Sequence, residues 1–121
     1  MKTILIMLAI ILIPFSTQAA DPECYQLKFT PVNDGPPVLV IDTIKPMTHE
    51  KSLVAKSPQE VKKNCNKVGQ EIYERLMVKE PDVRQVVISY RQIAIVLFPL
   101  GSDWTKMQPK IEATLNRVLC K

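Results

Sequence analysis

Four segments of the chain carry the apolar patterns that predict β-strands. Residues 24–29 alternate between apolar and polar side chains, as an edge or half-exposed strand does. Residues 38–44 and 83–89 are rich in β-branched side chains, which favour strands. Residues 92–98 form a fourth strand, which a two-residue turn joins to the third. The pattern therefore predicts two pairs of strands separated by a long central segment.

That central segment carries the spacing of an amphipathic helix. Ser57 precedes Pro58 at the first helical position, and Glu60 completes a capping box. Apolar side chains then recur at spacings of three and four, which predicts one helix that ends near Val78. Gly69 in its middle lowers helix stability by about 1 kcal/mol relative to alanine. Close packing of a strand or of a second helix against this point would explain a glycine there.

A second helix is predicted near the C-terminus, where Ile111, Leu115 and Val118 form an apolar stripe. Pro109 cannot donate a hydrogen bond inside a helix. The helix proper is therefore expected to begin near residues 106–108, after a first turn capped by a preceding polar residue, or to kink there.

The order β-β-α-β-β-α predicts an α+β fold, with a four-stranded, mainly antiparallel sheet and two helices packed on one face. Such a fold hides only one face of the sheet. Residues 92–98 are nevertheless apolar on both sides, and residues 38–41 behave alike. The second face is therefore expected to be covered by the loop of residues 45–56, by a second copy of the chain or by a partner.

Residues 92–119 form a strand, a glycine-containing loop and a helix, and loosely resemble in shape the metallochaperone-type and iron–sulfur scaffold-type α/β domains. The matching loop, residues 99–103, lacks the cysteine pair that those domains carry. The resemblance therefore implies no metal function, and no cofactor is expected.

The first twenty residues have the order of a secretory signal peptide. Lys2 is followed by an apolar run over residues 4–13 and then by small and polar residues up to Ala20. The run is too short to span a bilayer, and no second one follows. We therefore expect residues 1–20 to be removed, with cleavage after Ala19 as the alternative. Residues 21–121 are expected to form one small domain that is secreted or periplasmic, without an integral membrane segment.

Charge narrows the choice of partner only slightly. The chain has a formal net charge of +4, of which Lys2 in the leader supplies one. The basic residues are scattered and form no Lys/Arg-rich patch of the kind that binds nucleic acid. We expect no nucleic-acid partner, and a weak preference for an acidic partner stays open.

Three cysteines remain after the leader, which allows one disulfide and one free thiol in an oxidising compartment. Cys65 lies on the apolar stripe of the first helix, whereas Cys120 lies off the stripe of the second. This placement favours a Cys24–Cys120 disulfide and a buried, inert Cys65. Pairing of Cys24 with Cys65 is the alternative.

Signals for catalysis are weak. Cys65 and His49 are conceivable as a nucleophile and its base, although nothing in their spacing requires it. His49 is the one histidine, and a single histidine cannot supply the usual ligand set of a metal. We expect no enzyme activity and no metal site.

A protein-binding role is the function that the sequence favours. Ala94, Val96 and Phe98 are the interface candidates on the second face of the fourth strand. Trp104 is either a lid on the core or a further interface anchor, because tryptophan is enriched at binding hot spots. We expect a small exported protein, such as an inhibitor, an immunity protein or an envelope accessory subunit, that binds a protein partner or a second copy. The alternatives are the thiol enzyme and a binder of an anionic envelope component.

Overall fold

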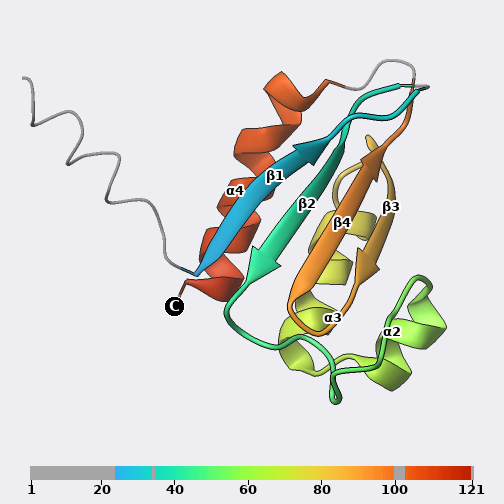
Figure 1. Ribbon diagram of the computed structural model, residues 1–121, viewed down its shortest axis with the longest axis vertical. Helices are drawn as coiled ribbons and strands as arrows, with labels where there is room; N and C mark the ends of the chain where they lie inside the picture. The colour runs from blue at the N-terminus through green and yellow to red at the C-terminus, as the bar shows by residue number, and fades with distance from the viewer. Residues whose placement is uncertain (1–23, 34, 100–102, 121) are drawn as a thin grey trace, which may run out of the picture.

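Four antiparallel strands form one sheet in the order β1-β2-β4-β3 (Figure 1). The computed structural model describes residues 24–33, 35–99 and 103–120. Its strands are β1 (Tyr25–Thr30), β2 (Val38–Thr43), β3 (Val83–Ile88) and β4 (Gln92–Leu97). The α+β class and the predicted order of strands and helices are confirmed. The predicted leader, residues 1–20, lies outside the described residues.

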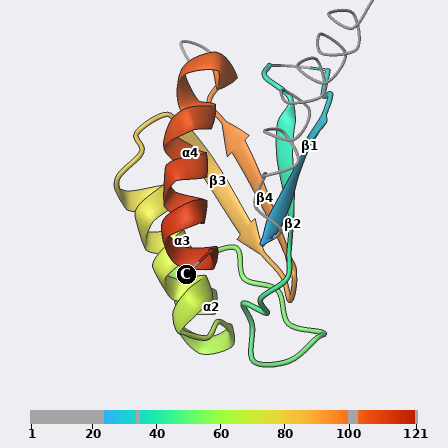
Figure 2. The same ribbon diagram turned by 90° about the vertical axis from the view of Figure 1, so that its left-hand side faces the viewer.

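Helices cover one face of this sheet (Figure 2). They are α2 (Pro58–Asn64), α3 (Lys67–Tyr73), the π-helical turn η1 (Glu74–Val78) and α4 (Trp104–Leu119). The core between the two layers is fully apolar at its centre, where Leu39, Ile41, Ile93 and Ile95 of the central strands are completely buried. The helices contribute side chains such as Ile72, Leu76, Ile111 and Leu115 to the same core.

The single helix expected over residues 57–78 is divided at Cys65. Ser57 caps α2 as predicted, because its hydroxyl accepts from the backbone N–H of Glu60 at 3.2 Å. Cys65 then adopts an extended conformation, and Asn66 starts α3 by accepting from the N–H of Gly69 at 3.0 Å. The apolar stripe continues across the break because both helices face the core. The apolar spacing in the sequence therefore did not indicate that a second N-cap, Asn66, divides the segment into two helices.

Gly69 is packed against a loop rather than against a strand or the second helix. A Cβ at this position would lie well inside van der Waals contact of the carbonyl oxygen of Met47 and 3.0 Å from the Cβ of Cys65. Met47 itself is fully buried. The glycine therefore allows the loop between β2 and α2 to pass directly over α3.

Helix α4 begins at Trp104, two to four residues before the start predicted for the helix proper at residues 106–108. Asp103 caps it by accepting from the N–H of Thr105 at 2.9 Å. Pro109 lies inside the helix and is exposed. The carbonyl that loses its helical partner belongs to Thr105, which is also exposed, so water can satisfy it.

A disulfide joins the start of β1 to the end of α4. Cys24 and Cys120 have Cα atoms 5.5 Å apart and are separated by 96 positions in the sequence. Next to this bond, the hydroxyl of Tyr25 donates to Oδ1 of Asn116 at 2.9 Å. The edge strand β1 is thus fastened to the helix layer by a covalent bond and a hydrogen bond, and Cys65 is the free cysteine.

Replacing both members of this pair, as in C24S/C120S, is expected to lower the free energy of unfolding by about 2–5 kcal/mol, because the unfolded chain gains the freedom of a long open loop. Urea unfolding followed by circular dichroism measures this. Reductant should destabilise the wild-type protein by a similar amount and leave the double variant unchanged. A wild-type protein that is insensitive to reductant would contradict the expectation.

The substitution Gly69→Ala is expected to destabilise the fold by about 1–3 kcal/mol, because the new methyl group must displace the Met47 carbonyl. Helix propensity alone would instead stabilise by about 1 kcal/mol. Thermal unfolding therefore distinguishes the two effects by the sign of the change, and an increase in melting temperature would refute tight packing at this site.

Candidate functional site

The candidate site is the face of the sheet opposite the helices, which we call the open face. Alternation along β4 buries Ile93, Ile95 and Leu97 against the helices and leaves Ala94 and Val96 on the open face, where both are partly exposed. Strand β2 alternates in the same way. The predicted double apolarity of the two central strands is therefore present in the structure.

The apolar side chains of the open face form one continuous strip. Val40 and Val87 pair with Ala94 from the two sides, so these three residues lie in one row across β2, β4 and β3. Continuing the register of β2 and β4 places Val38 opposite Val96 in the next row. All five side chains are partly exposed. Val87 was missed by the sequence analysis, although the apolar run Val86-Val87-Ile88 is a signal of a strand that is apolar on both faces.

Polar side chains border this strip on its edges. Lys28 and Gln85, on the two outer strands, pair with Val40 and Val96 and are exposed. At the lower end, Gln92 donates to Oδ1 of Asp42 at 3.2 Å. An apolar centre with a polar border is the composition of a protein-binding surface.

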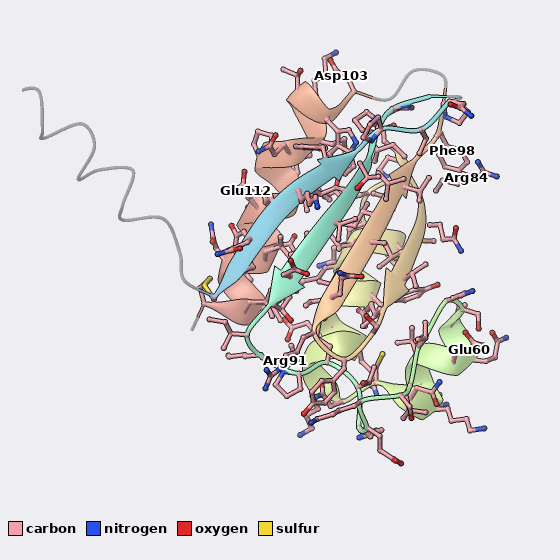
Figure 3. The ribbon with its side chains drawn as sticks, in the orientation of Figure 1. Glu60, Arg84, Arg91, Phe98, Asp103 and Glu112 are labelled. Carbon is pink, nitrogen blue, oxygen red and sulfur yellow. A yellow bond between two sulfur atoms is a disulfide. The ribbon has the colours of Figure 1, made fainter. Side chains whose placement is uncertain are left out.

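Phe98 extends the strip at its upper end. It follows Leu97 on the open-face side of the alternation and is 45% exposed. Arg84 lies at the bulge of β3 beside it, since Val83 pairs with Leu97, and Figure 3 labels both residues at this end of the sheet. The structure thus brings together three of the four interface candidates: Ala94, Val96 and Phe98.

Trp104, the fourth candidate, lies away from the open face. Its side chain is only 7% exposed, and its indole nitrogen donates to the carbonyl oxygen of Pro37 at 2.6 Å. Its ring packs edge-on against Phe29 with centroids 5.5 Å apart. Trp104 therefore occupies the place of a lid on the upper end of the core.

The loop of residues 45–56 does not cover the open face. Its residue Met47 donates to the carbonyl of Tyr90 at 2.8 Å, and Ala55 exchanges two hydrogen bonds with Ile88 at 2.8 and 2.9 Å. The loop therefore runs around the lower end of the sheet and along the outer edge of β3. No helix or loop among the described residues lies over the open face (Figures 1 and 2).

Cys65 and His49 do not form a catalytic pair. Cys65 is completely buried, and burial raises the pKa of its thiol to about 11. The side chain of His49 is exposed, and no hydrogen bond joins it to the thiol. A reactive cysteine needs a lowered pKa and access to solvent, so this thiol lacks both properties.

No group of three or more His, Cys, Asp or Glu side chains within the described residues is placed to hold a metal ion. No helix in the described part has the length and apolarity needed to cross a bilayer.

Comparison with known proteins gave no match to a protein-family model, a curated protein or a solved structure.

Alkylation is expected to leave Cys65 unmodified in the native protein and to label one thiol per chain in denaturant without reductant. Burial penalises the thiolate and raises the pKa of Cys65 from 9.0 to about 11, so this group has no effect on stability below pH 9 and lowers the free energy of unfolding as the pH rises from 9 toward 11. Mass spectrometry after iodoacetamide treatment at pH 8 measures the labelling. Rapid native labelling that slows in the H49A variant would instead support a thiol–histidine pair.

Proposed function

We propose that the protein is a small exported binding protein, without catalytic activity, that holds a protein partner on the open face of its sheet. The observation that carries the proposal is the strip of partly exposed apolar side chains on β2, β4 and β3, which no described helix or loop covers.

The free energy gained by burying apolar surface favours a partner that covers the strip. Burial of apolar surface contributes about 25 cal/mol per Å2, so covering several valine side chains contributes several kcal/mol to association. The strip is built from short, mostly β-branched side chains on regular strands. Such side chains lose little conformational freedom on binding, which lowers the entropic cost of association. Phe98, at one end of the strip, supplies the large side chain that typically anchors an interface.

Export is supported by two independent features. Residues 1–20 have the composition of a secretory leader. The Cys24–Cys120 pair is bonded, which fits an oxidising compartment outside the cytoplasm. An inhibitor, an immunity protein and an accessory subunit of envelope machinery would all act in such a place through one binding surface.

The substitution Val96→Asp is expected to weaken association with the partner at least about tenfold, because a carboxylate would be buried in the apolar strip. Val78→Asp is the matched control. Val78 lies in η1, on the helix side of the sheet, and is 74% exposed, so the same chemical change there should have no effect on binding. Circular dichroism should show that both variants keep the fold.

The binding itself is measured in two ways with the wild-type protein and both variants. Light scattering after size-exclusion chromatography detects self-association, and pull-down from secreted or envelope fractions, with and without reductant, detects another protein. The proposal is supported if V96D loses the complex while the wild-type protein and V78D keep it. A monomer that retains no protein, or that retains the same proteins in all three forms, refutes it.

A further inference from the structure

A second surface lies on the opposite side of the molecule, between η1 and α4. It is a groove of about 300 Å3. Its lining consists of Arg75, Glu80, Lys110, Ala113, Thr114 and Arg117. The polar side chains of α4 in this lining, Lys110, Thr114 and Arg117, are spaced four and three residues apart and therefore share one side of the helix. The groove is separate from the open face, because the helices lie between the two surfaces (Figure 2).

The charges of this lining are unbalanced. Three of the six residues are cationic and one, Glu80, is anionic, which leaves a net charge of +2. Lys110 and Arg117 make no ion pair with a carboxylate of the described residues. The scattered cations of the sequence are thus brought together here by the packing of η1 beside α4.

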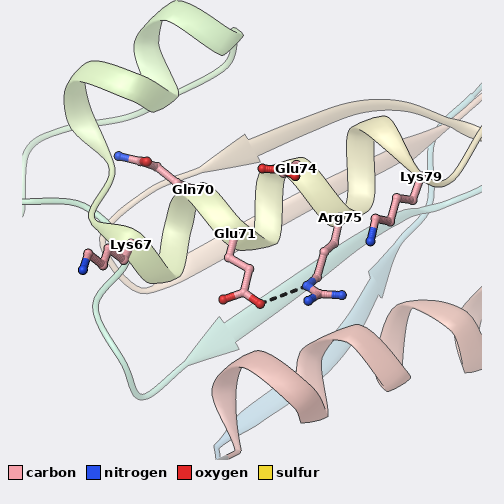
Figure 4. Close-up of a pocket in the computed structure, with 6 residues that line it drawn as sticks. All are labelled: Lys67, Gln70, Glu71, Glu74, Arg75 and Lys79. Atoms are coloured by element: carbon pink, nitrogen blue, oxygen red, sulfur yellow. Dashed lines mark hydrogen bonds and ion pairs between the residues drawn. The ribbon is translucent and has the colours of Figure 1, made fainter.

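Arg75 is oriented by a neighbouring carboxylate. Its Nε donates to Oε2 of Glu71, one helical turn earlier, at 3.0 Å. This bond uses one edge of the guanidinium group, and Figure 4 shows Glu71 and Arg75 joined on the same side of this helical segment. Arg75 lines the groove together with residues of α4. No second carboxylate of the described residues forms an ion pair with Arg75. Arg75 also lies in a π-helical turn, a rare backbone form that often occurs at functional sites.

This set of groups matches the chemistry of a phosphate group. Arginine presents several N–H donors in a planar fork, lysine presents a mobile ammonium, and the hydroxyl of Thr114 can donate a further bond. Binding an anion would also offset the positive charges of Lys110 and Arg117, whereas Arg75 already has the Glu71 carboxylate beside it. The carboxylate of Glu80, the one anionic residue of the lining, can accept a hydrogen bond from a hydroxyl group next to the phosphate.

We propose that the groove between η1 and α4 binds a phosphate-bearing ligand, with Arg75, Lys110 and Arg117 as its cationic contacts. The phosphate could belong to a small soluble molecule or to a lipid headgroup. In both cases a phosphate group with one or two negative charges presents its oxygens to the groove. This site does not depend on the proposed function of the open face.

The double variant K110Q/R117Q tests the proposal. Both side chains are exposed, so the fold should persist. Its matched control is K62Q/K63Q, which removes the same number of charges from two exposed residues of α2, outside the groove.

Titration with inorganic phosphate and pyrophosphate, followed by NMR chemical shifts or calorimetry, tests for binding of soluble ligands. Sedimentation with phosphatidylglycerol vesicles, compared with phosphatidylcholine vesicles, covers lipids. Residues 1–20 are the same in all three proteins, so any lipid contact they make cancels in the comparison.

We expect K110Q/R117Q to weaken binding about tenfold and K62Q/K63Q to change it little. Binding should also weaken as salt concentration rises. This pattern with phosphate or pyrophosphate identifies a soluble ligand, and the same pattern with vesicles alone identifies a lipid headgroup. Equal effects of the two double variants would show that only the overall charge matters, and that result overturns the proposal, as does the absence of binding in both assays. The V96D variant should bind phosphate normally, which separates this site from the open face.

Discussion

Pairing of β2 with β4 at the centre of the sheet is the constraint on which the rest of the structure depends. Leu39 and Ile95 pair in this register, and both are completely buried under the helices. Because side chains alternate along a strand, the same register places Val40 and Ala94 together on the other side. A shift by one residue would exchange the two sets and put the larger side chains in water. The register that builds the core thus also builds the open face.

Much of this fold follows from local patterns, and the departures have specific physical causes. The strands are predictable because their apolar alternation and β-branched residues are continuous, as in Gln92–Leu97. The break between α2 and α3 is not predictable from the sequence. Asn66 is an ordinary polar residue there, and it acts as a helix cap only because Cys65 is extended beside Thr48 in the folded protein. Pro109 suggested a later helix start, yet an exposed position in the second turn of α4 tolerates it. The contact of Gly69 with the Met47 carbonyl joins residues 22 positions apart, which no short-range pattern can indicate.

The open face can be predicted from the sequence, whereas the groove between η1 and α4 cannot. The open face is visible as an unbroken apolar run, because neighbouring residues of one strand point to opposite faces. The groove is invisible, because its cations come from η1 and from α4, and the helix spacing only shows that Lys110 and Arg117 share a side. Their approach to Arg75 is a product of tertiary packing. An apolar surface and a basic groove on opposite sides would let the protein hold two unlike ligands at once without competition between them.

The bond between Cys24 and Cys120 joins residues 96 positions apart, one at the start of β1 and one at the end of α4. It cannot close until both cysteines have been synthesised and have reached an oxidising compartment. In the folded protein, the packing of β1 beside α4 holds the two Cα atoms 5.5 Å apart, a separation at which the bond forms without backbone movement. A C120S variant would keep the residues of every described strand and helix but would lack this cross-link, and its loss would be felt first at β1, the strand that the bond fastens to α4.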